Sequence, residues 1–350
     1  MLTWSLVMST YNRGPALKRC VELVLQQTRL PKEIIVIDAS DPWKENRRLT
    51  VEDAIPRHPD IRWEYEQARV RSLTAQRNQG LAMARSDVLF LIDDDAFMYP
   101  DCAEEILKVY EADPERAVAG VAPIEASRAP GDPAAPAEPT DDRPPAGLNP
   151  FRRFLAYWET QVDVDRLLLP YDPEYPDRPV PPGVLALGAF RARHFNGFRM
   201  TFRREPIQRE GFDETLKRYA AAEDLDASYR VSRHGALAIT PRARIFHSED
   251  PSGRLTRYTR YALGLINMGV LLRLKGYDPS LLLHRYRKLV GRRIWVDLLR
   301  DVGRRRFSLP YVRAARFALG VIKSLAERDV ADLKAWFPAF QTELIERNPS

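Results

Sequence analysis

Three consecutive carboxylates, Asp93, Asp94 and Asp95, are the residues of this sequence best suited to chemistry. They follow the short apolar run Val88–Ile92, which has the length and composition of a buried strand. Adjacent carboxylates repel one another, so such a cluster is costly unless a cation or hydrogen-bond donors compensate for it. Mg²⁺ and Mn²⁺ take oxygen ligands of this kind, and such an ion offsets the charge of a diphosphate. The alternative is a solvated acidic turn, but the position directly after a strand favours the metal site.

Two further side chains are suited to ligand binding. Asp38 follows the apolar run Ile34–Ile37 and could hydrogen-bond a nucleobase or a ribose, with a helix N-cap or turn role as an equal alternative. Arg77 precedes the acidic strand, and its planar guanidinium suits bidentate recognition of a diphosphate. For Arg77 the alternative is a surface salt bridge.

A second pair of adjacent acids, Glu223 and Asp224, stands at an expected helix start. Acids in a first turn complement the helix dipole, which is the structural alternative. A desolvated carboxylate beside an acidic neighbour also has a raised pKa, which suits a general base acting on an acceptor hydroxyl. His247 follows the strand-like segment 243–246 and could complete a metal site of oxygen and nitrogen ligands, although a lone histidine is more often structural.

The elements that must position these residues alternate between strand and helix over residues 1–125. Short apolar runs predict strands at 4–9, 34–37, 61–65, 88–92 and 117–121, with amphipathic helices between them. This alternation predicts a mostly parallel sheet with helices on both faces, and ligands bind such sheets at the carboxyl ends of the strands. Three of the predicted strands end there in polar clusters: Thr10-Tyr11-Asn12-Arg13, Asp38-Ala39-Ser40 and Asp93-Asp94-Asp95.

The rest of the chain divides into a proline-rich stretch and a basic end. Residues 127–182 carry prolines among Ala, Asp and Gly and are predicted to be a loop, with a helix inside it at 151–169. Helical spacing resumes at Leu255. The segment 254–323 holds 17 Lys or Arg against three acids, although the whole chain has a formal net charge of only +6. Such asymmetry indicates an anionic partner, which could be phospholipid, a lipid phosphate or nucleic acid.

Cysteine use and the apolar segments indicate the compartment. Cys20 and Cys102 stand in no metal-binding spacing, which predicts no disulfide framework and a reducing, cytoplasmic environment. The N-terminal residues lack the basic start of a signal peptide, so none is expected. The longest uncharged apolar stretch, 261–272, is shorter than the roughly 20 residues that cross a bilayer.

Taken in order, these motifs resemble the family 2 glycosyltransferases, inverting enzymes of the GT-A fold. The resemblance covers roughly residues 3–250, interrupted by the proline-rich stretch. The segments that carry it are Ser9–Arg13, Glu33–Asp38, Ala75–Gly80, Phe90–Asp95, Gly197–Arg204, Gly211–Asp213 and Glu223-Asp224. The resemblance implies an α/β fold of the GT-A class, that is, a Rossmann-like, doubly wound, mostly parallel sheet. A helical, basic C-terminal extension would follow it.

The resemblance also implies roles for individual residues. Asp95, with Asp93 and His247, would ligate Mg²⁺ or Mn²⁺ in the manner of the DXD motif. Asp224, beside Glu223, would be the catalytic base of an inverting displacement. The nucleotide or donor would contact Thr10, Tyr11, Arg13, Asp38, Arg77, Asp93 and Asp94, and the sugar or acceptor pocket would include Gly197, Arg203 and Arg204. No Gln-x-x-Arg-Trp motif follows Asp224, which predicts single-sugar transfer rather than processive synthesis.

We therefore predict a metal-dependent glycosyltransferase that moves one sugar from a UDP- or dTDP-sugar to a saccharide or lipid-linked acceptor in the synthesis of a polysaccharide, glycolipid or envelope glycan. The predicted regions are a nucleotide-sugar-binding half (1–125), a proline-rich insert (126–184), an acceptor-binding half (185–252) and a basic helical extension (253–350). We expect peripheral contact with the inner face of the membrane through 254–323, and no nucleic-acid partner.

Two alternatives remain open at this point. A sugar nucleotidyltransferase would share the sheet and the acidic ligands, but Gly14 stands alone where a glycine-rich phosphate loop would follow the first strand. A non-catalytic protein that binds membrane or nucleic acid through the basic end would leave both acidic clusters unexplained.

Overall fold

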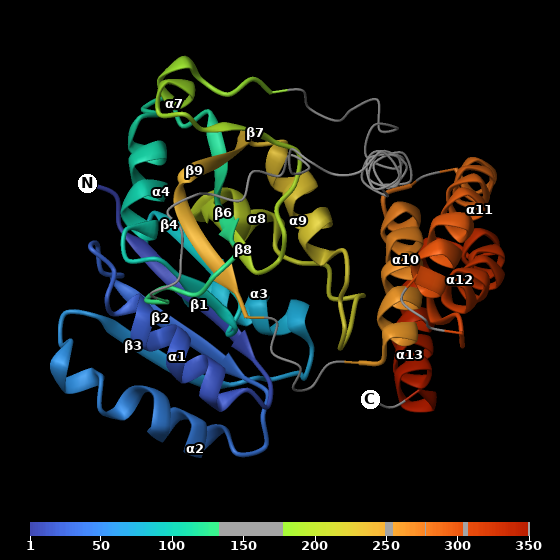
Figure 1. Ribbon diagram of the computed structural model, residues 1–350, viewed down its shortest axis with the longest axis horizontal. Coiled ribbons are helices and arrows are strands. Elements are labelled where there is room, and N and C mark those ends of the chain that lie inside the picture. The colour runs from blue at the N-terminus through green and yellow to red at the C-terminus, as the bar shows by residue number, and fades with distance from the viewer. Residues whose placement is uncertain (133–177, 249–254, 277, 304–306, 349–350) are drawn as a thin grey trace. The chain divides into compact units, whose positions relative to one another are not determined.

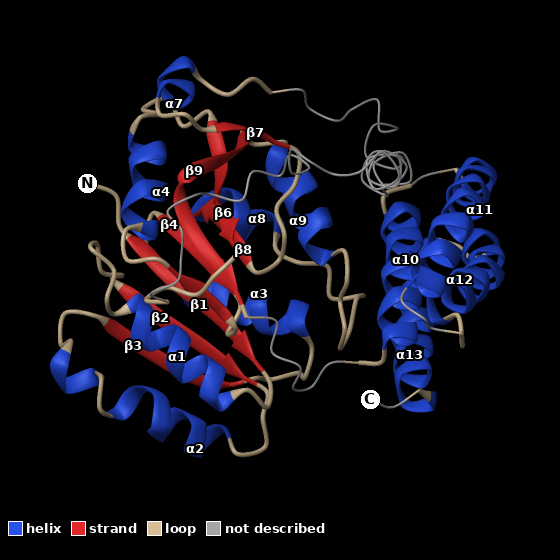
Figure 2. Ribbon diagram, in the orientation of Figure 1, coloured by secondary structure: helices blue, strands red, loops and turns tan. Residues whose placement is uncertain are grey.

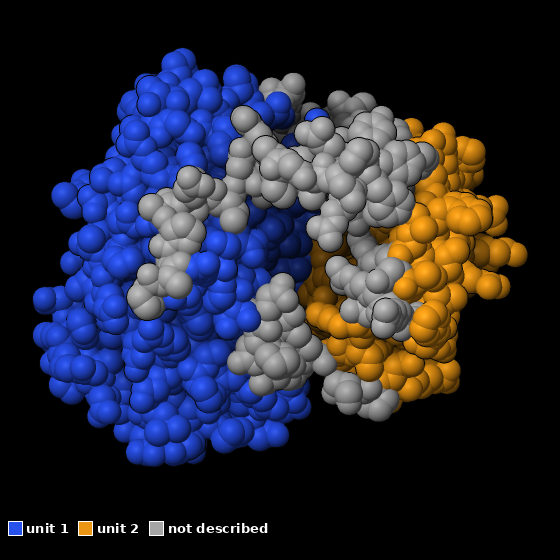
Figure 3. All heavy atoms as spheres, in the orientation of Figure 1, with its two compact units in different colours: residues 1–140, 176–213, 223–253 blue, residues 141–175, 214–222, 254–350 orange. Residues whose placement is uncertain are grey.

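A computed structural model describes residues 1–132, 178–248, 255–276, 278–303 and 307–348 of the chain (Figure 1). The helix expected at 151–169 lies outside these residues. The described residues fall into two compact units (Figure 3). The first comprises 1–132, 178–213 and 223–248, and the second comprises 214–222 and the described residues from 255 onward.

The first unit is built on one sheet, with nine strands among the described residues (Figure 2). One side is parallel in the order β3-β2-β1-β4, formed by β1 (Trp4–Thr10), β2 (Glu33–Asp38), β3 (Arg62–Gln67) and β4 (Val88–Ile92). The other side is mixed and contains β5 (Ala96–Met98), β6 (Val118–Ala126), β7 (Phe190–Ala192), β8 (Arg199–Arg203) and β9 (Ala236–His247). Strand β8 runs antiparallel to β4 and β6, whereas β9 is parallel to β6 and antiparallel to β5 and β7.

Helices cover both faces of this sheet because its strands are apolar on both sides. Along β1, Leu6 and Met8 join one core with helices α1 (Gly14–Val24) and α4 (Cys102–Glu111), whereas Val7 joins another. That second core contains residues of α3 (Leu73–Met83), α8 (Arg204–Glu210) and α9 (Glu223–Ser232). The shorter helices are α2 (Trp43–Arg47), η1 (Arg48–Glu52), η2 (Ile55–Arg57) and α7 (Pro182–Ala186).

The second unit is helical. Its elements are α10 (Arg257–Leu274), α11 (Pro279–Gly303), α12 (Pro310–Glu327) and α13 (Val330–Arg347). Buried amides tie the segment 214–222 to these helices: Gln341 accepts the N–H of Lys217 at 2.7 Å, and Asn267 donates to the carbonyl of Ala221 at 3.0 Å. Among the described residues, no helix holds an apolar stretch long enough to cross a lipid bilayer.

The strands and helices predicted for residues 1–125 are confirmed, as are the helices of the basic end. The sequence did not indicate the direction of β8. Its antiparallel pairing places Arg199 beside Ile92 and Arg203 beside Val88, at the two ends of β4. This difference in direction decides which arginine lies near Asp93.

Candidate active site

Polar strand ends meet at one edge of the sheet. Strands β1, β2 and β4 are parallel neighbours, and Thr10 stands opposite Asp38 in the β1–β2 register. Gln76 of α3 donates from Nε2 to the carbonyls of Thr10 and Ile37, at 3.0 Å each, and so fixes the two strand ends side by side. The acidic cluster begins at Asp93, directly after β4. The carboxyl ends of parallel strands are where α/β sheets bind ligands, so this edge is the candidate site.

Asp93, Asp95 and His247 form a candidate metal group. Each offers one ligand atom, and these atoms lie within 4.8 Å of one another. His247 reaches the group because β9 ends beside β5; its Nε2 is 3.3 Å from Oδ1 of Asp95, and its ring stacks on Phe198 with centroids 4.4 Å apart. Burial lowers the pKa of His247, but the hydrogen bond and charge of Asp95 more than reverse this and raise it. Two carboxylates and an imidazole are a donor set that fits a divalent metal ion.

Asp94 has different partners from its two neighbours. Its Oδ2 accepts the hydroxyl hydrogen of Thr10 at 2.6 Å, and its Oδ1 is 3.1 Å from Nη1 of Arg13. The same Nη1 lies 3.2 Å from Oδ2 of Asp95. Burial raises the pKa of Asp94 to about 7, although Arg13 and Thr10 oppose the shift. Asp94 therefore joins the turn after β1 to the acidic cluster, and Thr10 and Arg13 both lie at the metal group.

Arg77 connects the metal group to the second acidic pair. Its guanidinium is buried, with the side chain 3% exposed. One nitrogen, Nη2, donates to Oδ1 of Asp93 and to the carbonyl of Gly197, both at 2.9 Å, while Nη1 donates to Glu223. The aromatic ring of Phe212 lies 5.2 Å from the guanidinium carbon. Arg77 is thus a buried cation shared by the carboxyl groups of Asp93 and Glu223, not a surface salt bridge.

The two acids at the start of α9 differ in their surroundings. Glu223 is buried and held by Arg77, and its burial together with Asp224 raises its pKa to about 8. Asp224 is half-buried; its Oδ2 accepts the N–H of Gly197 at 2.8 Å and its Oδ1 that of Leu225 at 2.8 Å. Burial raises the pKa of Asp224 as well. Asp224 is the acid that an incoming hydroxyl could reach.

The side chain of Asp38 is fully buried. Its Oδ1 accepts the N–H of Ser40 at 2.7 Å, and its Oδ2 accepts from Asn46 at 2.9 Å and from the hydroxyl of Tyr65 at 2.7 Å. Burial and the hydrogen bond to Asp38 raise the pKa of Tyr65 well above its ordinary value. Asp38 therefore sits at the expected strand end and there organises the turn after β2.

Tyr11, in the turn after β1, carries a stacked arginine. The guanidinium carbon of Arg71 lies 4.6 Å from the centre of the Tyr11 ring, and its Nη1 donates to the Tyr11 hydroxyl at 3.2 Å. Arg71 also pairs with Asp41 at 2.8 Å. The stack orders the outer part of the turn, beside the predicted nucleotide residues.

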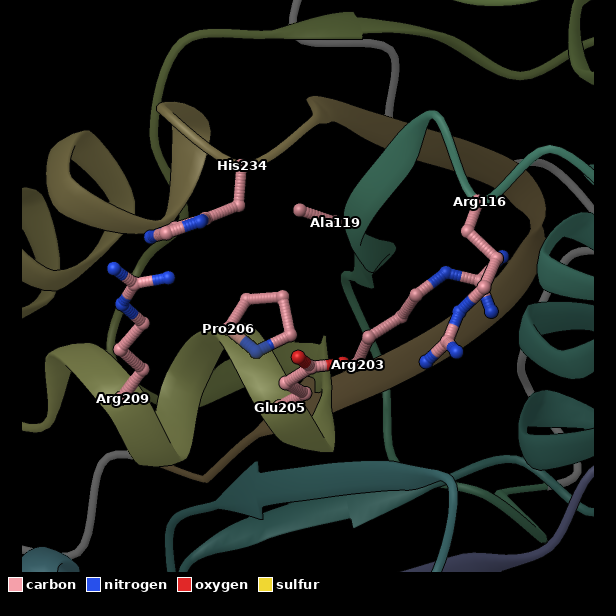
Figure 4. A pocket seen from close by; sticks show the side chains of 7 residues that line it. All are labelled: Arg116, Ala119, Arg203, Glu205, Pro206, Arg209 and His234. Carbon is pink, nitrogen blue, oxygen red and sulfur yellow. The ribbon is translucent and has the colours of Figure 1, made fainter.

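Arg203 and Arg204, predicted for the sugar or acceptor pocket, lie at the other edge of the sheet. Arg203 is buried and donates to the carbonyl of Val118 at 2.9 Å and to Oδ2 of Asp113 at 3.2 Å. It borders a separate cavity of about 270 Å³, whose lining Figure 4 shows. Four strand residues, at about 3.4 Å each, separate Arg203 from the site end of β8. The structure thus brings Gly197 into the site and leaves these two arginines outside it.

Several residues that lie at this edge of the sheet were not predicted from the sequence to belong to the site. Arg199 lies next to Ile92 and donates from Nη1 to the carbonyl of Pro123 at 3.0 Å. The side-chain amide of Asn78 makes two hydrogen bonds to the backbone of Phe212. It accepts the N–H at 2.8 Å and donates to the carbonyl at 2.9 Å. The signal for Asn78, and for Gln76, was the unbroken polar run 76–79 within a helix, since four consecutive helical residues cannot all face water.

Two solved structures of glycosyltransferases resemble this chain in fold. Among solved structures, the chain is similar to GalNAc-T7 with UDP, GalNAc and Mn²⁺ (TM-score 0.51, 19% identity, 78% of this chain and 48% of that one). It is also similar to the mannosyltransferase PcManGT of Pyrobaculum calidifontis in complex with GDP-Man and Mn²⁺ (TM-score 0.50, 16% identity, 98% of this chain and 85% of that one). These likenesses establish the GT-A fold.

Sequence comparison relates the N-terminal part of the chain to known glycosyltransferases. Residues 5–162 match the model of glycosyl transferase family 2. A segment of 108 residues is 36% identical to the uncharacterized glycosyltransferase YwdF of Bacillus subtilis (strain 168), covering 31% of this chain and 38% of that protein. The N-terminal part of the chain is thus similar to glycosyl transferase family 2. The chain spans well under half of that relative's length.

Proposed function

We propose that this protein is an inverting glycosyltransferase that moves a single sugar from a nucleoside-diphosphate sugar to an acceptor hydroxyl. The position of Arg77 carries the proposal, because it binds Asp93 of the metal group and Glu223 beside the candidate base. A site for the leaving diphosphate and a site for the attacking hydroxyl thus lie one side chain apart. A displacement in one step needs this proximity of ion and base.

Asp224 is the proposed general base. Its Oδ2 is oriented by the N–H of Gly197, its raised pKa increases its basicity, and its side chain is only half-buried, which leaves it accessible to an acceptor. The acceptor oxygen forms a bond to the anomeric carbon while the bond from that carbon to the diphosphate oxygen breaks. The hydroxyl proton passes to Asp224, and attack from the side opposite the leaving group inverts the configuration.

Asp93, Asp95 and His247 would hold a divalent ion that offsets the charge of the departing nucleoside diphosphate. Two similar solved structures contain a nucleotide or nucleotide sugar with Mn²⁺, which supports the binding of a nucleotide sugar and a divalent ion here. We propose UDP or dTDP as the nucleotide. The polar turn at Thr10–Arg13 and the turn after β2, which Asp38 organises from its buried position, would receive it.

The proposed acceptor is a saccharide or a lipid-linked saccharide, in the synthesis of a surface glycan. Two buried, free thiols, Cys20 and Cys102, are compatible with the reducing compartment expected from the sequence.

Calorimetric titration with UDP, dTDP and GDP, with and without Mn²⁺, tests the donor site. We expect metal-dependent binding of one nucleotide, and a loss of at least roughly 10–100-fold in Asp95→Ala, because even residues that only support metal ligands contribute that much. The matched control is Asp60→Ala, an exposed aspartate in the turn before β3, which should bind as the wild type does. Metal-independent binding, or unchanged binding in Asp95→Ala, would contradict the assignment.

Asp224→Asn tests the base separately from the donor. Transfer should fall by roughly 10²–10⁴-fold, the usual contribution of a general base, while nucleotide affinity stays unchanged. Wild-type turnover in this variant would remove Asp224 from the mechanism.

The nucleotidyltransferase alternative makes a different product. Incubation with a sugar 1-phosphate and a nucleoside triphosphate would then release pyrophosphate, and such release in place of sugar transfer would overturn the proposal.

A further inference from the structure

The exposed side of α11 carries an apolar patch. Trp295 is 70% exposed, and Leu299 and Val302 are each 49% exposed. Spacings of four and three residues place these three side chains on one face of the helix. Phe307, 79% exposed, follows shortly after the helix ends. Soluble proteins seldom leave large apolar side chains exposed in a group, so such a patch marks an interaction surface.

The same face is cationic one and two turns before the patch. Lys288 and Arg292 are exposed and stand seven and three residues ahead of Trp295. Both acids of α11 lie on the inner side: Asp297 and Asp301 are fully buried, accepting the hydroxyl of Tyr261 at 2.6 Å and a backbone N–H of α12 at 3.0 Å. These inward bonds fix the rotation of α11, and the outward face carries no carboxylate from Pro279 to Gly303.

We propose that this outer face of α11, formed by Lys288, Arg292, Trp295, Leu299 and Val302 with Phe307 beyond it, docks on an anionic phospholipid surface. Indole rings favour the boundary between headgroups and acyl chains, and aliphatic side chains on the same face enter with them. Lysine and arginine beside such a face are attracted to acidic headgroups. A patch of this size would lie in the interface without spanning the bilayer.

Charge complementarity selects lipid over a second copy of the chain. Residues 254–323 contain 17 Lys or Arg against three acids, so two such surfaces would repel each other on meeting. An anionic bilayer supplies the opposite charge and the apolar phase together. Docking would bring the transferase to lipid-borne acceptors, and this consequence rests on the proposed function. The docking proposal itself does not depend on that function.

Flotation with vesicles tests the docking, using the full chain in the presence of EDTA so that neither donor nor metal takes part. The protein should float with vesicles of phosphatidylcholine and phosphatidylserine and remain unbound with phosphatidylcholine alone. Each cation of the face is worth about fivefold in partitioning, so Lys288→Gln with Arg292→Gln should weaken binding by roughly 25-fold. High salt should weaken wild-type binding in the same direction.

A second variant tests the apolar patch, because polar substitution of exposed side chains leaves the core intact. Trp295→Ser with Phe307→Ser should abolish flotation while metal-dependent nucleotide binding is retained. The matched control is Phe190→Ser, at a 44% exposed aromatic residue of β7 outside this surface, which should float as the wild type does.

Three outcomes would overturn the docking proposal. One is absence of wild-type binding to either vesicle. Another is equal binding by the α11 variants and the wild type. The third is self-association without lipid that the same variants remove, because it would assign the face to a second copy. Failure of sugar transfer alone would count against the proposed function and leave the docking result unaffected.

Discussion

Replacing Arg77 by methionine should destabilise the protein by an amount that depends on pH. The substitution keeps much of the side-chain length but removes the buried cation that Asp93, Gly197 and Glu223 share. The Asp93 side chain is 32% exposed, so water can solvate it when the cation is lost. The Glu223 side chain is only 7% exposed, so water cannot solvate it in the same way. The cost therefore falls mainly on Glu223.

The magnitude follows from the state of Glu223. Removing one partner of a buried ion pair costs about 3–5 kcal/mol, and we expect this near pH 9. The wild-type pKa of Glu223 is raised to about 8, so near pH 6 the carboxyl is already protonated in both proteins. In the variant its pKa rises further, so the carboxyl keeps its proton at pH 9, one unit above the wild-type pKa. That unit is worth on the order of 1 kcal/mol, by which the cost should be smaller near pH 6.

The sign of this pH dependence follows from proton binding. A carboxyl with a raised folded pKa contributes stability that is present below its unfolded pKa and is lost as pH rises through the folded pKa. The wild type completes this loss near pH 8, whereas the variant continues to lose stability above it. Urea unfolding of both proteins at the two pH values measures the difference.

Two comparisons make the experiment decisive. Arg203→Met removes another buried arginine, paired with Asp113 at 3.2 Å, and should destabilise without the component due to Glu223. Adding Glu223→Gln to Arg77→Met removes the titrating group and should abolish the pH-dependent part. A cost below about 1 kcal/mol at both pH values, or an equal cost at both, would refute the reasoning.

Three further predictions concern the site, the thiols and the second unit. Gly197→Ala would place a Cβ 3.0 Å from Oε1 of Glu223, so turnover should fall about tenfold through misplacement of the base while nucleotide affinity, measured by calorimetry, is kept. Burial raises the pKa of both Cys20 and Cys102, so neither should react with a thiol reagent at pH 8 until urea unfolds the protein, and rapid labelling of the native chain would contradict this. Asp329→Ala removes the side-chain N-cap of α13 and should lower the free energy of unfolding by about 1 kcal/mol, and an unchanged urea midpoint would count against the cap.

The sequence by itself determined the half of the site that depends on local pattern. Val88–Ile92 is an apolar run that can form only a buried strand or a short buried helix, and its length together with Asp93 after it favours the strand. Once the alternation of strands and helices implies parallel strands, their carboxyl ends must meet at one edge. The proximity of Thr10, Asp38 and Asp93 therefore followed without coordinates.

Only the tertiary structure decided which more distant residues complete the site. Arg77 and Glu223, 146 residues apart, meet through the packing of two helices on the same face of the sheet. The exclusion of Arg203 depends on the direction of β8, which its sequence does not encode, because side chains alternate with the same period of two in either direction. The sequence also does not distinguish the roles of Glu223 and Asp224. The position of Arg77 decides that Glu223 is bound by the guanidinium and that Asp224 remains accessible to an acceptor. Local pattern specifies an element and its buried faces, whereas strand direction and the partners of a buried charge depend on long-range pairing.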